Sequence, residues 1–371
     1  MKKLIIAALL LLTGSLIYAQ NRQINFEKLS LKEALAKAKQ EKKSVFLDCF
    51  TTWCIPCKQM EAGVFTKDSV ADFYNKNFIN IKVDMEKGEG PELRKLYAVG
   101  AYPSYLILDT EGKVKNKFVG GMPVKEFLAN AQKGLTTNSE EAQLNARYQA
   151  GERTHELMRA YIKQKVKVME ITRAKQLNDE LMASLTPQQK ASPENWFLFG
   201  QNRYTMYLSD LFSPNFMYLA NHWKGFAAQN SKDTVDKKLS SVYRQIASWT
   251  LNGFYFKVKP FDKNTYEAYK KQIGNTQMPD KVQLLVMMDI AIAAGEKNEP
   301  EVRRLLLKNL STFSEDNRRI LFDYPTFART IKGFKFPQIA ELSDEISKSS
   351  TNPFLVNLYK DMKKRYADQA N

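Results

Sequence analysis

The chain has 371 residues, and 44% of them are hydrophobic, so apolar burial alone can stabilise it; at this length we expect two domains. Its 56 basic and 40 acidic side chains give a formal net charge of +16, which makes nucleic acid the first partner to consider. No stretch combines clustered arginines with a recognised nucleic-acid-binding motif, and the N-terminus indicates export. We therefore expect no nucleic-acid partner.

Residues 1–19 are typical of an export signal. Lys2 and Lys3 make a basic start, residues 4–12 form an apolar run, and Ala19 is a small residue at a suitable cleavage position. The apolar run is too short for a convincing membrane-spanning helix. We predict cleavage after Ala19 and a periplasmic or otherwise exported protein; the alternative is an uncleaved N-terminal anchor.

Residues 24–134 alternate helix and strand patterns. Ser30 and Glu33 form a capping box before a helix over 31–40, and 44–50 is a short β-branched and aromatic strand. Further elements are expected in this order: helices over 55–62 and 68–77, a strand over 78–84, a helix over 91–97, a hairpin of strands 104–109 and 114–120, and a helix ending at Gly134. The pattern predicts an α/β domain, with a small mixed sheet that has helices on both faces.

Residues 135–141 are polar and indicate a domain boundary. Beyond them the apolar residues recur at helical spacing and are separated by Gly and Pro, with no sustained strand pattern. We therefore expect an α/β domain over 20–135 and an all-helical domain of unknown role over 136–371.

All three cysteines of the chain lie in the segment FLDCFTTWCIPCKQM, residues 46–60. Cys54 and Cys57 fall between a buried strand and a helix, so Cys54 lies at a helix N-terminus, where the helix dipole favours a thiolate. An exposed thiolate there can attack a partner's disulfide, and Cys57, three residues on, can resolve the mixed disulfide. Pro56 stiffens the helix start.

Other interpretations of the cysteine pair are a zinc site and a permanent structural disulfide. Zinc needs four ligands, but there is one such pair, and the chain's two histidines, His155 and His222, lie in the helical half. A structural disulfide would close a very short loop and add little stability. We predict no metal and no cofactor other than a redox-active Cys54–Cys57 disulfide. Cys49 is expected to be a small buried side chain, with a redox or regulatory role as the alternative.

The segment VFLDCFTTWCIPCK, with AYPSYLILDTEGKV downstream, resembles the thioredoxin superfamily, and most closely the thioredoxin-like domains of exported thiol–disulfide interchange proteins. The resemblance covers roughly residues 24–135. It implies a thioredoxin fold for the domain over 20–135, with Cys54 as the nucleophile and Cys57 as the resolving thiol. It also implies that Tyr102–Pro103 is a cis bond, that Tyr102 and Pro103 bind substrate, and that Trp53 shields the thiolate and contacts substrate. The alternatives are a trans proline opening an edge strand and simple packing of Trp53.

Asp48 matches the buried acid that this superfamily uses to move a proton to or from the resolving cysteine, which requires a raised pKa. The alternative is a solvated aspartate at the strand end. Family members often carry a lysine near this acid; the expected equivalent here is Asn80, with Lys82 two residues later. The sequence therefore does not decide which charge lies next to Asp48, nor the details of its proton transfer.

The sequence predicts an exported thiol–disulfide oxidoreductase with an appended helical domain. Because Ile55 cannot stabilise a thiolate as a histidine would, we favour a reductase acting on envelope proteins, recharged by a membrane-bound thiol donor. The alternative is an envelope interaction or scaffold protein whose dithiol is vestigial or structural. Its candidate partner-binding surface is the aromatic-rich stretch 213–226, which is otherwise interpreted as helical core.

Overall fold

The computed structural model describes residues 22–136, 140–200, 205–331 and 337–367. The chain forms two compact units, one up to Ser184 and one from Leu185. The predicted export signal, residues 1–19, lies outside the described residues. Within them, no helix is both long enough and apolar enough to cross a membrane.

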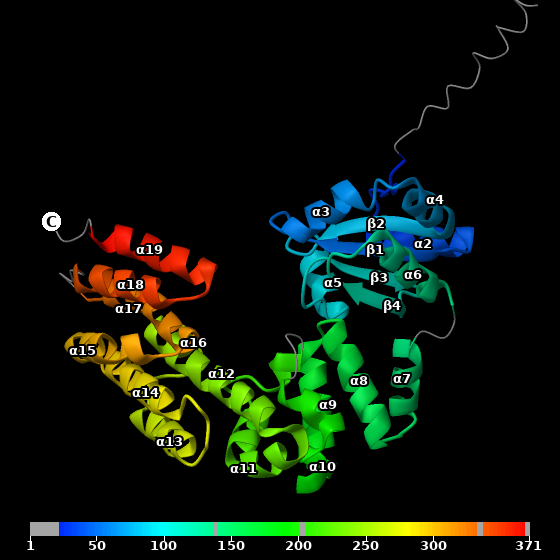
Figure 1. The fold of residues 1–371 in the computed structure, drawn as a ribbon. Helices are drawn as coiled ribbons and strands as arrows, with labels where there is room; N and C mark the ends of the chain where they lie inside the picture. The colour runs from blue at the N-terminus through cyan, green and yellow to red at the C-terminus, as the bar shows by residue number, and fades with distance from the viewer. Residues whose placement is uncertain (1–21, 137–139, 201–204, 332–336, 368–371) are drawn as a thin grey trace, which may run out of the picture. The chain divides into compact units, whose positions relative to one another are not determined.

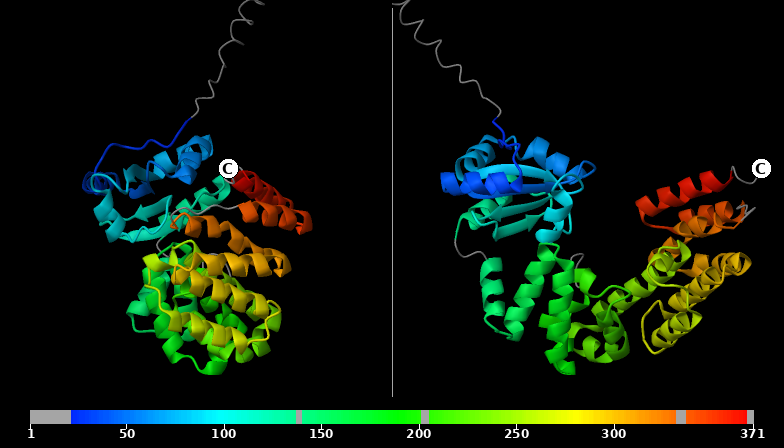
Figure 2. Two further views of the ribbon diagram at one scale, coloured as in Figure 1. Left: turned by 90° about the vertical axis from the view of Figure 1, so that its left-hand side faces the viewer. Right: turned by 180° about the vertical axis from the view of Figure 1, so that it is seen from behind.

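The first unit is built on a four-stranded mixed sheet in the order β2-β1-β3-β4 (Figure 1). Strand β1 (Ser44–Phe50) runs parallel to β2 (Phe78–Asp84) and antiparallel to β3 (Ser104–Leu108), and β3 pairs with β4 (Val114–Val119). The helices around it are α2 (Leu31–Glu41), α3 (Ile55–Gly63), α4 (Asp68–Asn77), α5 (Gly90–Leu96) and α6 (Val124–Leu135). The predicted α/β fold, with helices on both faces of the sheet, is confirmed (Figure 2).

Two separate cores cover the two faces of this sheet, because neighbouring side chains of a strand point to opposite sides. Val45, Leu47 and Cys49 pack with α2 and α5, whereas Phe46 packs with α3, α4 and α6. The capping box that begins α2 is present. Gly134 lies inside α6 rather than at its end; a Cβ there would come within 2.3 Å of the Ile107 side chain, so close helix–sheet packing is its role.

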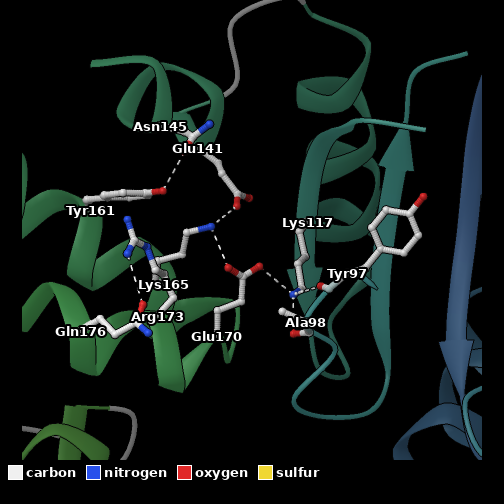
Figure 3. Close-up of polar contacts among 10 residues, drawn as sticks. All are labelled: Tyr97, Ala98, Lys117, Glu141, Asn145, Tyr161, Lys165, Glu170, Arg173 and Gln176. Atoms are coloured by element: carbon white, nitrogen blue, oxygen red, sulfur yellow. Dashed lines mark hydrogen bonds and ion pairs between the residues drawn. The ribbon is translucent and has the colours of Figure 1, made fainter. Parts of the chain in front are cut away.

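Three more helices complete the first unit: α7 (Glu140–Gln149), α8 (His155–Lys167) and α9 (Ile171–Ser184). The boundary expected near residue 136 therefore falls inside this unit. A chain of ion pairs connects these helices to β4 (Figure 3). Lys117 of β4 pairs with Glu170, Glu170 with Lys165 of α8, and Lys165 with Glu141 of α7.

Within its described residues, every regular element of the second unit is a helix, as predicted. Its α-helices are α10 (Pro187–Ala191), α11 (Pro214–Asn230), α12 (Lys232–Leu251), α13 (Lys263–Gly274), α14 (Lys281–Gly295), α15 (Glu299–Asn309), α16 (Glu315–Arg318), α17 (Tyr324–Ala328), α18 (Pro337–Ser349) and α19 (Pro353–Ala367). Short 3₁₀ turns lie between them: η1 (Pro193–Phe199), η2 (Thr205–Leu208), η3 (Tyr255–Lys257), η4 (Leu310–Thr312) and η5 (Arg319–Phe322). Successive helices pack against each other, for example α13 on α14 and α18 on α19.

Candidate active site

Cys54 and Cys57 form a disulfide at the start of α3, with their sulfurs 2.03 Å apart. Cys54 is the N-cap of the helix, and its Sγ accepts a hydrogen bond from the Cys57 backbone N–H at 3.1 Å. Pro56 lies in the first turn, as expected. The helix N-terminus therefore directs backbone donors at the sulfur that was predicted to carry negative charge.

The disulfide is sheltered. Cys54 is 2% exposed and Cys57 7% exposed, which differs from the exposed sulfur expected for the nucleophile. The flanking side chains are open to solvent instead: Trp53 is 61% exposed and Ile55 66%. A partner that displaces or packs on these two side chains would approach the disulfide from this side.

Trp53 is held in place on two sides. Its indole Nε1–H donates to the Glu86 carboxylate at 3.0 Å, and its ring packs edge-on against Tyr102 with centroids 5.8 Å apart. The guanidinium of Arg94 lies 5.9 Å from the centre of the Tyr102 ring. Simple packing beneath the loop does not describe so exposed a tryptophan; the arrangement suits a contact surface around the disulfide.

The peptide bond between Tyr102 and Pro103 is cis, as predicted. The bond immediately precedes β3, and the Pro103 carbonyl accepts a hydrogen bond from the Gly120 N–H after β4. The Ser104 hydroxyl donates to the Ala101 carbonyl and fixes the same loop. The loop that carries Tyr102 is thus tied to both strands of the hairpin.

Asp48 lies on β1 and is 5% exposed, so the alternative of a solvated strand-end carboxylate is wrong. Its Oδ1 is buried and has no hydrogen-bond partner among the described residues. Burial raises the pKa of Asp48 to about 7, because the cost of desolvation outweighs the attraction of the Lys82 ammonium; the Glu61 carboxylate adds to the rise. A carboxyl with this pKa can both give and take a proton near neutral pH.

The strand register identifies the basic neighbour of Asp48. Asp48 pairs with Lys82 on β2, whereas Asn80 pairs with Phe46. Lys82, and not the expected Asn80, therefore occupies the position beside the acid. Lys82 in turn forms an ion pair with Glu61 of α3, so two opposite charges act on Asp48.

Three contributing residues were not singled out from the sequence: Glu61, Glu86 and Arg94. Glu61 follows Cys57 by four residues, which places both on one face of α3 and was a detectable signal. Glu86 and Arg94 reach the site through loop and helix geometry that no local pattern reveals. Cys49 is a free, fully buried thiol in the core on the α2 face, and burial raises its pKa well above the ordinary value.

In the stretch 213–226, Ser213 caps α11 of the second unit and the residues after it form the first part of that helix. Phe216, Trp223 and Phe226 are buried, so for these aromatics the interpretation as helical core is confirmed. The helix is kinked at His222, whose ring stacks on Tyr218 with centroids 4.1 Å apart.

Comparisons with known proteins agree with this geometry. A family described as "Thioredox_DsbH: Protein of unknown function, DUF255" matches residues 16–181, which ends close to the boundary between the two units. The thiol:disulfide interchange protein DsbD of Vibrio vulnificus is 32% identical over 123 residues, covering 31% of this chain and 20% of that protein. Thioredoxin-1 of Drosophila melanogaster is 38% identical over 66 residues, covering 18% of this chain and 57% of that protein.

Among solved structures, a protein from Bacteroides thetaiotaomicron described as a disulphide-isomerase is 47% identical. The match covers 32% of this chain and 99% of that one, with a TM-score of 0.31. The chain spans about a fifth of the length of the DsbD relatives that it matches. Fold, cysteine spacing, cis-proline and sequence similarity agree over residues 24–135, and this part of the chain belongs to the thioredoxin superfamily and is homologous to thiol–disulfide interchange proteins.

Proposed function

We propose that this protein is an exported thiol–disulfide oxidoreductase that reduces disulfides of cell-envelope proteins through Cys54 and Cys57. A membrane-bound thiol donor recharges the pair, and no cofactor is needed besides the Cys54–Cys57 disulfide itself. Trp53, Tyr102 and Pro103 form the surface on which the substrate lies. The proposal rests chiefly on one observation: the disulfide begins α3, the helix that follows strand β1, and β1 carries a buried carboxyl, Asp48, whose pKa is raised to about 7.

The reaction balances as two successive thiol exchanges. The Cys54 thiolate attacks a sulfur of the substrate disulfide, forms a mixed disulfide and releases one substrate thiolate, which takes a proton from solvent. Asp48 then accepts the proton of Cys57, whose thiolate attacks the Cys54 sulfur and expels the second substrate thiolate; that thiolate takes up the proton that Asp48 gives back. Two electrons pass from the protein's dithiol to the substrate, and the Cys54–Cys57 disulfide is regenerated.

The direction of electron flow is tested by the reduction potential of the pair in the mature protein, measured against a glutathione or dithiothreitol series. A value near about −270 mV supports a reductase, whereas one near about −120 mV indicates an oxidant. If no reversible two-electron transition is found, the oxidoreductase proposal fails.

The cysteine roles are tested by trapping. In Cys57→Ser the mixed disulfide on Cys54 cannot be resolved, so substrate proteins should accumulate as adducts that dithiothreitol releases. Cys54→Ser should trap none, and Cys49→Ser should behave like the unmodified protein in this assay. Adducts formed equally well by Cys54→Ser would contradict the assignment of the nucleophile. N-terminal sequencing of the exported protein tests cleavage after Ala19.

A second candidate function, binding of a partner through the helical half, is favoured by a pocket in the second unit. The pocket has a volume of about 600 Å³ and is lined by Tyr218, His222 and Trp223 of the stretch 213–226, among other residues. This volume is in the usual range for ligand sites. If the cysteine pair proves redox-inert while His222→Ala abolishes capture of an envelope component, this second function replaces the first.

A further inference from the structure

A shallow groove of about 540 Å³ lies in the first unit between α5 and the start of α9. Arg94 and Lys95 of α5 line one wall, and Arg173 and Gln176 of α9 line the other. The groove is thus made jointly by the thioredoxin-like fold and by the helices that follow it. Nothing in the dithiol chemistry requires this second wall.

The floor of the groove is a tight contact between two loops. A Cβ on Gly100 would come within 2.2 Å of the Met169 carbonyl oxygen, so only glycine allows this approach. Behind the floor, the Lys117 ammonium donates to the carbonyls of Tyr97 and Ala98, each at 2.9 Å, and pairs with Glu170 at 2.8 Å (Figure 3). The two walls are therefore fixed to each other.

The groove has an excess of positive charge. Glu170, which also lines it, is neutralised from inside by Lys117 and Lys165, both of which are buried. Burial alone would raise the pKa of Glu170, but the two ammonium groups outweigh it and hold the pKa below its ordinary value. Within the described residues, Arg94, Lys95 and Arg173 form no ion pair with a carboxylate. Arg173 does contact Gln176 and the Tyr148 ring, and its charge helps to lower the pKa of Glu180.

Arg94 connects the groove with the surface around the disulfide. Arg94 lines the groove and also lies over the Tyr102 ring, and Tyr102 packs against Trp53, the residue before Cys54. A chain that crosses Tyr102 on its way to the disulfide therefore reaches the groove next. The cations along that path favour carboxylates on the incoming chain.

We propose that this groove binds an acidic segment of the substrate protein, adjacent to the disulfide that is exchanged. The inference rests on the proposed function and adds a specificity to it. The α8–α9 turn and the start of α9 then complete a substrate-binding surface that the thioredoxin-like fold alone does not provide.

The test uses the full-length reduced protein and two disulfide-bridged peptides that differ only in a flanking run of glutamates or glutamines. The acidic peptide should have the lower KM. Added salt should reduce the difference in KM between the two peptides, because salt screens exposed charges. In Lys95→Gln/Arg173→Gln, KM for the acidic peptide should rise about threefold to tenfold, since an exposed ion pair contributes up to about fivefold in affinity. The kcat, and both constants for the glutamine peptide, should stay unchanged.

The matched control is Lys32→Gln/Lys125→Gln, which removes the same charge from exposed positions on α2 and α6. If the control raises KM equally, the net charge of the protein and not the groove is responsible, and the proposal is wrong. Equal KM for the two peptides also overturns it while leaving the oxidoreductase function intact. If neither peptide is reduced, both proposals fail. Should the double variant not fold, the charge reversal Lys95→Glu alone must still raise KM selectively for the acidic peptide.

Discussion

Replacing Asp48 by Asn should stabilise the oxidised protein at alkaline pH. The folded-state pKa of Asp48 is about 7, against an ordinary value of 3.8. Below pH 3.8 the carboxyl is protonated whether the chain is folded or not, so folding buries no charge at this position. As pH rises from there to about 7, the unfolded chain releases the proton while the folded chain keeps it, so stability is lost progressively. Above about pH 7 the loss is complete.

The difference of about three pKa units, at about 1.4 kcal/mol each, gives an upper limit of about 4 kcal/mol. Asn has nearly the same shape as Asp and no charge to bury. At pH 8.5 Asp48→Asn should therefore raise the free energy of unfolding by up to about 4 kcal/mol, and at pH 4 the two proteins should be nearly equal.

The assay is urea unfolding of the oxidised protein, followed by amide hydrogen exchange in β1 and β3. These strands report on the first unit alone, so unfolding of the second unit does not obscure the result. Glu92→Gln, at an exposed position on α5, is the control and should show no comparable gain. A stability difference between Asp48→Asn and the unmodified protein that is the same at pH 4 and pH 8.5 would refute the argument from burial.

Two further predictions concern the charges around this site and behind the groove. Glu61→Gln removes a negative charge and frees Lys82 to act on Asp48, so the pKa of Asp48 should fall by roughly one unit. Lys82→Met should instead raise the pKa of Asp48. NMR titration of the Asp48 carboxyl carbon measures the direction of the pKa change in each variant. Lys117→Met leaves the negative charge of Glu170 poorly compensated, so it should lower the free energy of unfolding of the first unit by about 3 kcal/mol. The same hydrogen-exchange experiment measures this loss. A loss below about 0.5 kcal/mol would contradict a stabilising role for the buried ion pair.

The chemistry of the site was predictable because its signals are local. A strand, two cysteines three residues apart and a helix start lie within one short segment, and each element has its own pattern. The proline at 103 was assigned through the resemblance, and its cis bond followed. Burial of Asp48 could be predicted for a similar reason: it lies inside a strand whose residues alternate between two covered faces.

The partners of these residues were less predictable because they depend on register. Asn80 and Lys82 lie on the same strand, two residues apart, so they point to the same face of the sheet. Only the pairing of β1 with β2 decides which of them lies beside Asp48, and that pairing brings Lys82 there. A single strand carries no local information about such a register.

The extent of the first unit could not be predicted from the sequence for a different reason. In the sequence, four charged residues have the pattern of ordinary surface residues: Lys117, Glu141, Lys165 and Glu170. Residues 135–141 have the composition of a polar linker. In the structure these four side chains are almost entirely covered: the side-chain exposure is 1% for Lys117, 13% for Glu170, 9% for Lys165 and 12% for Glu141. Charged residues that bury one another leave no hydrophobic pattern to detect.

The order of these charges explains why α7, α8 and the α8–α9 turn accompany the thioredoxin-like fold. A lysine with 1% side-chain exposure on a sheet strand is costly unless a carboxylate compensates it, and Lys117 finds that carboxylate in Glu170. Glu170 also lies between Lys117 and a second buried lysine, Lys165, whose own charge is balanced by Glu141. Each charge is tolerated because the next is present, so the series requires α7, α8 and the α8–α9 turn together. Since Lys117 also holds the carbonyls of Tyr97 and Ala98, the same series fixes the loop that leads to Tyr102 and the cis-proline.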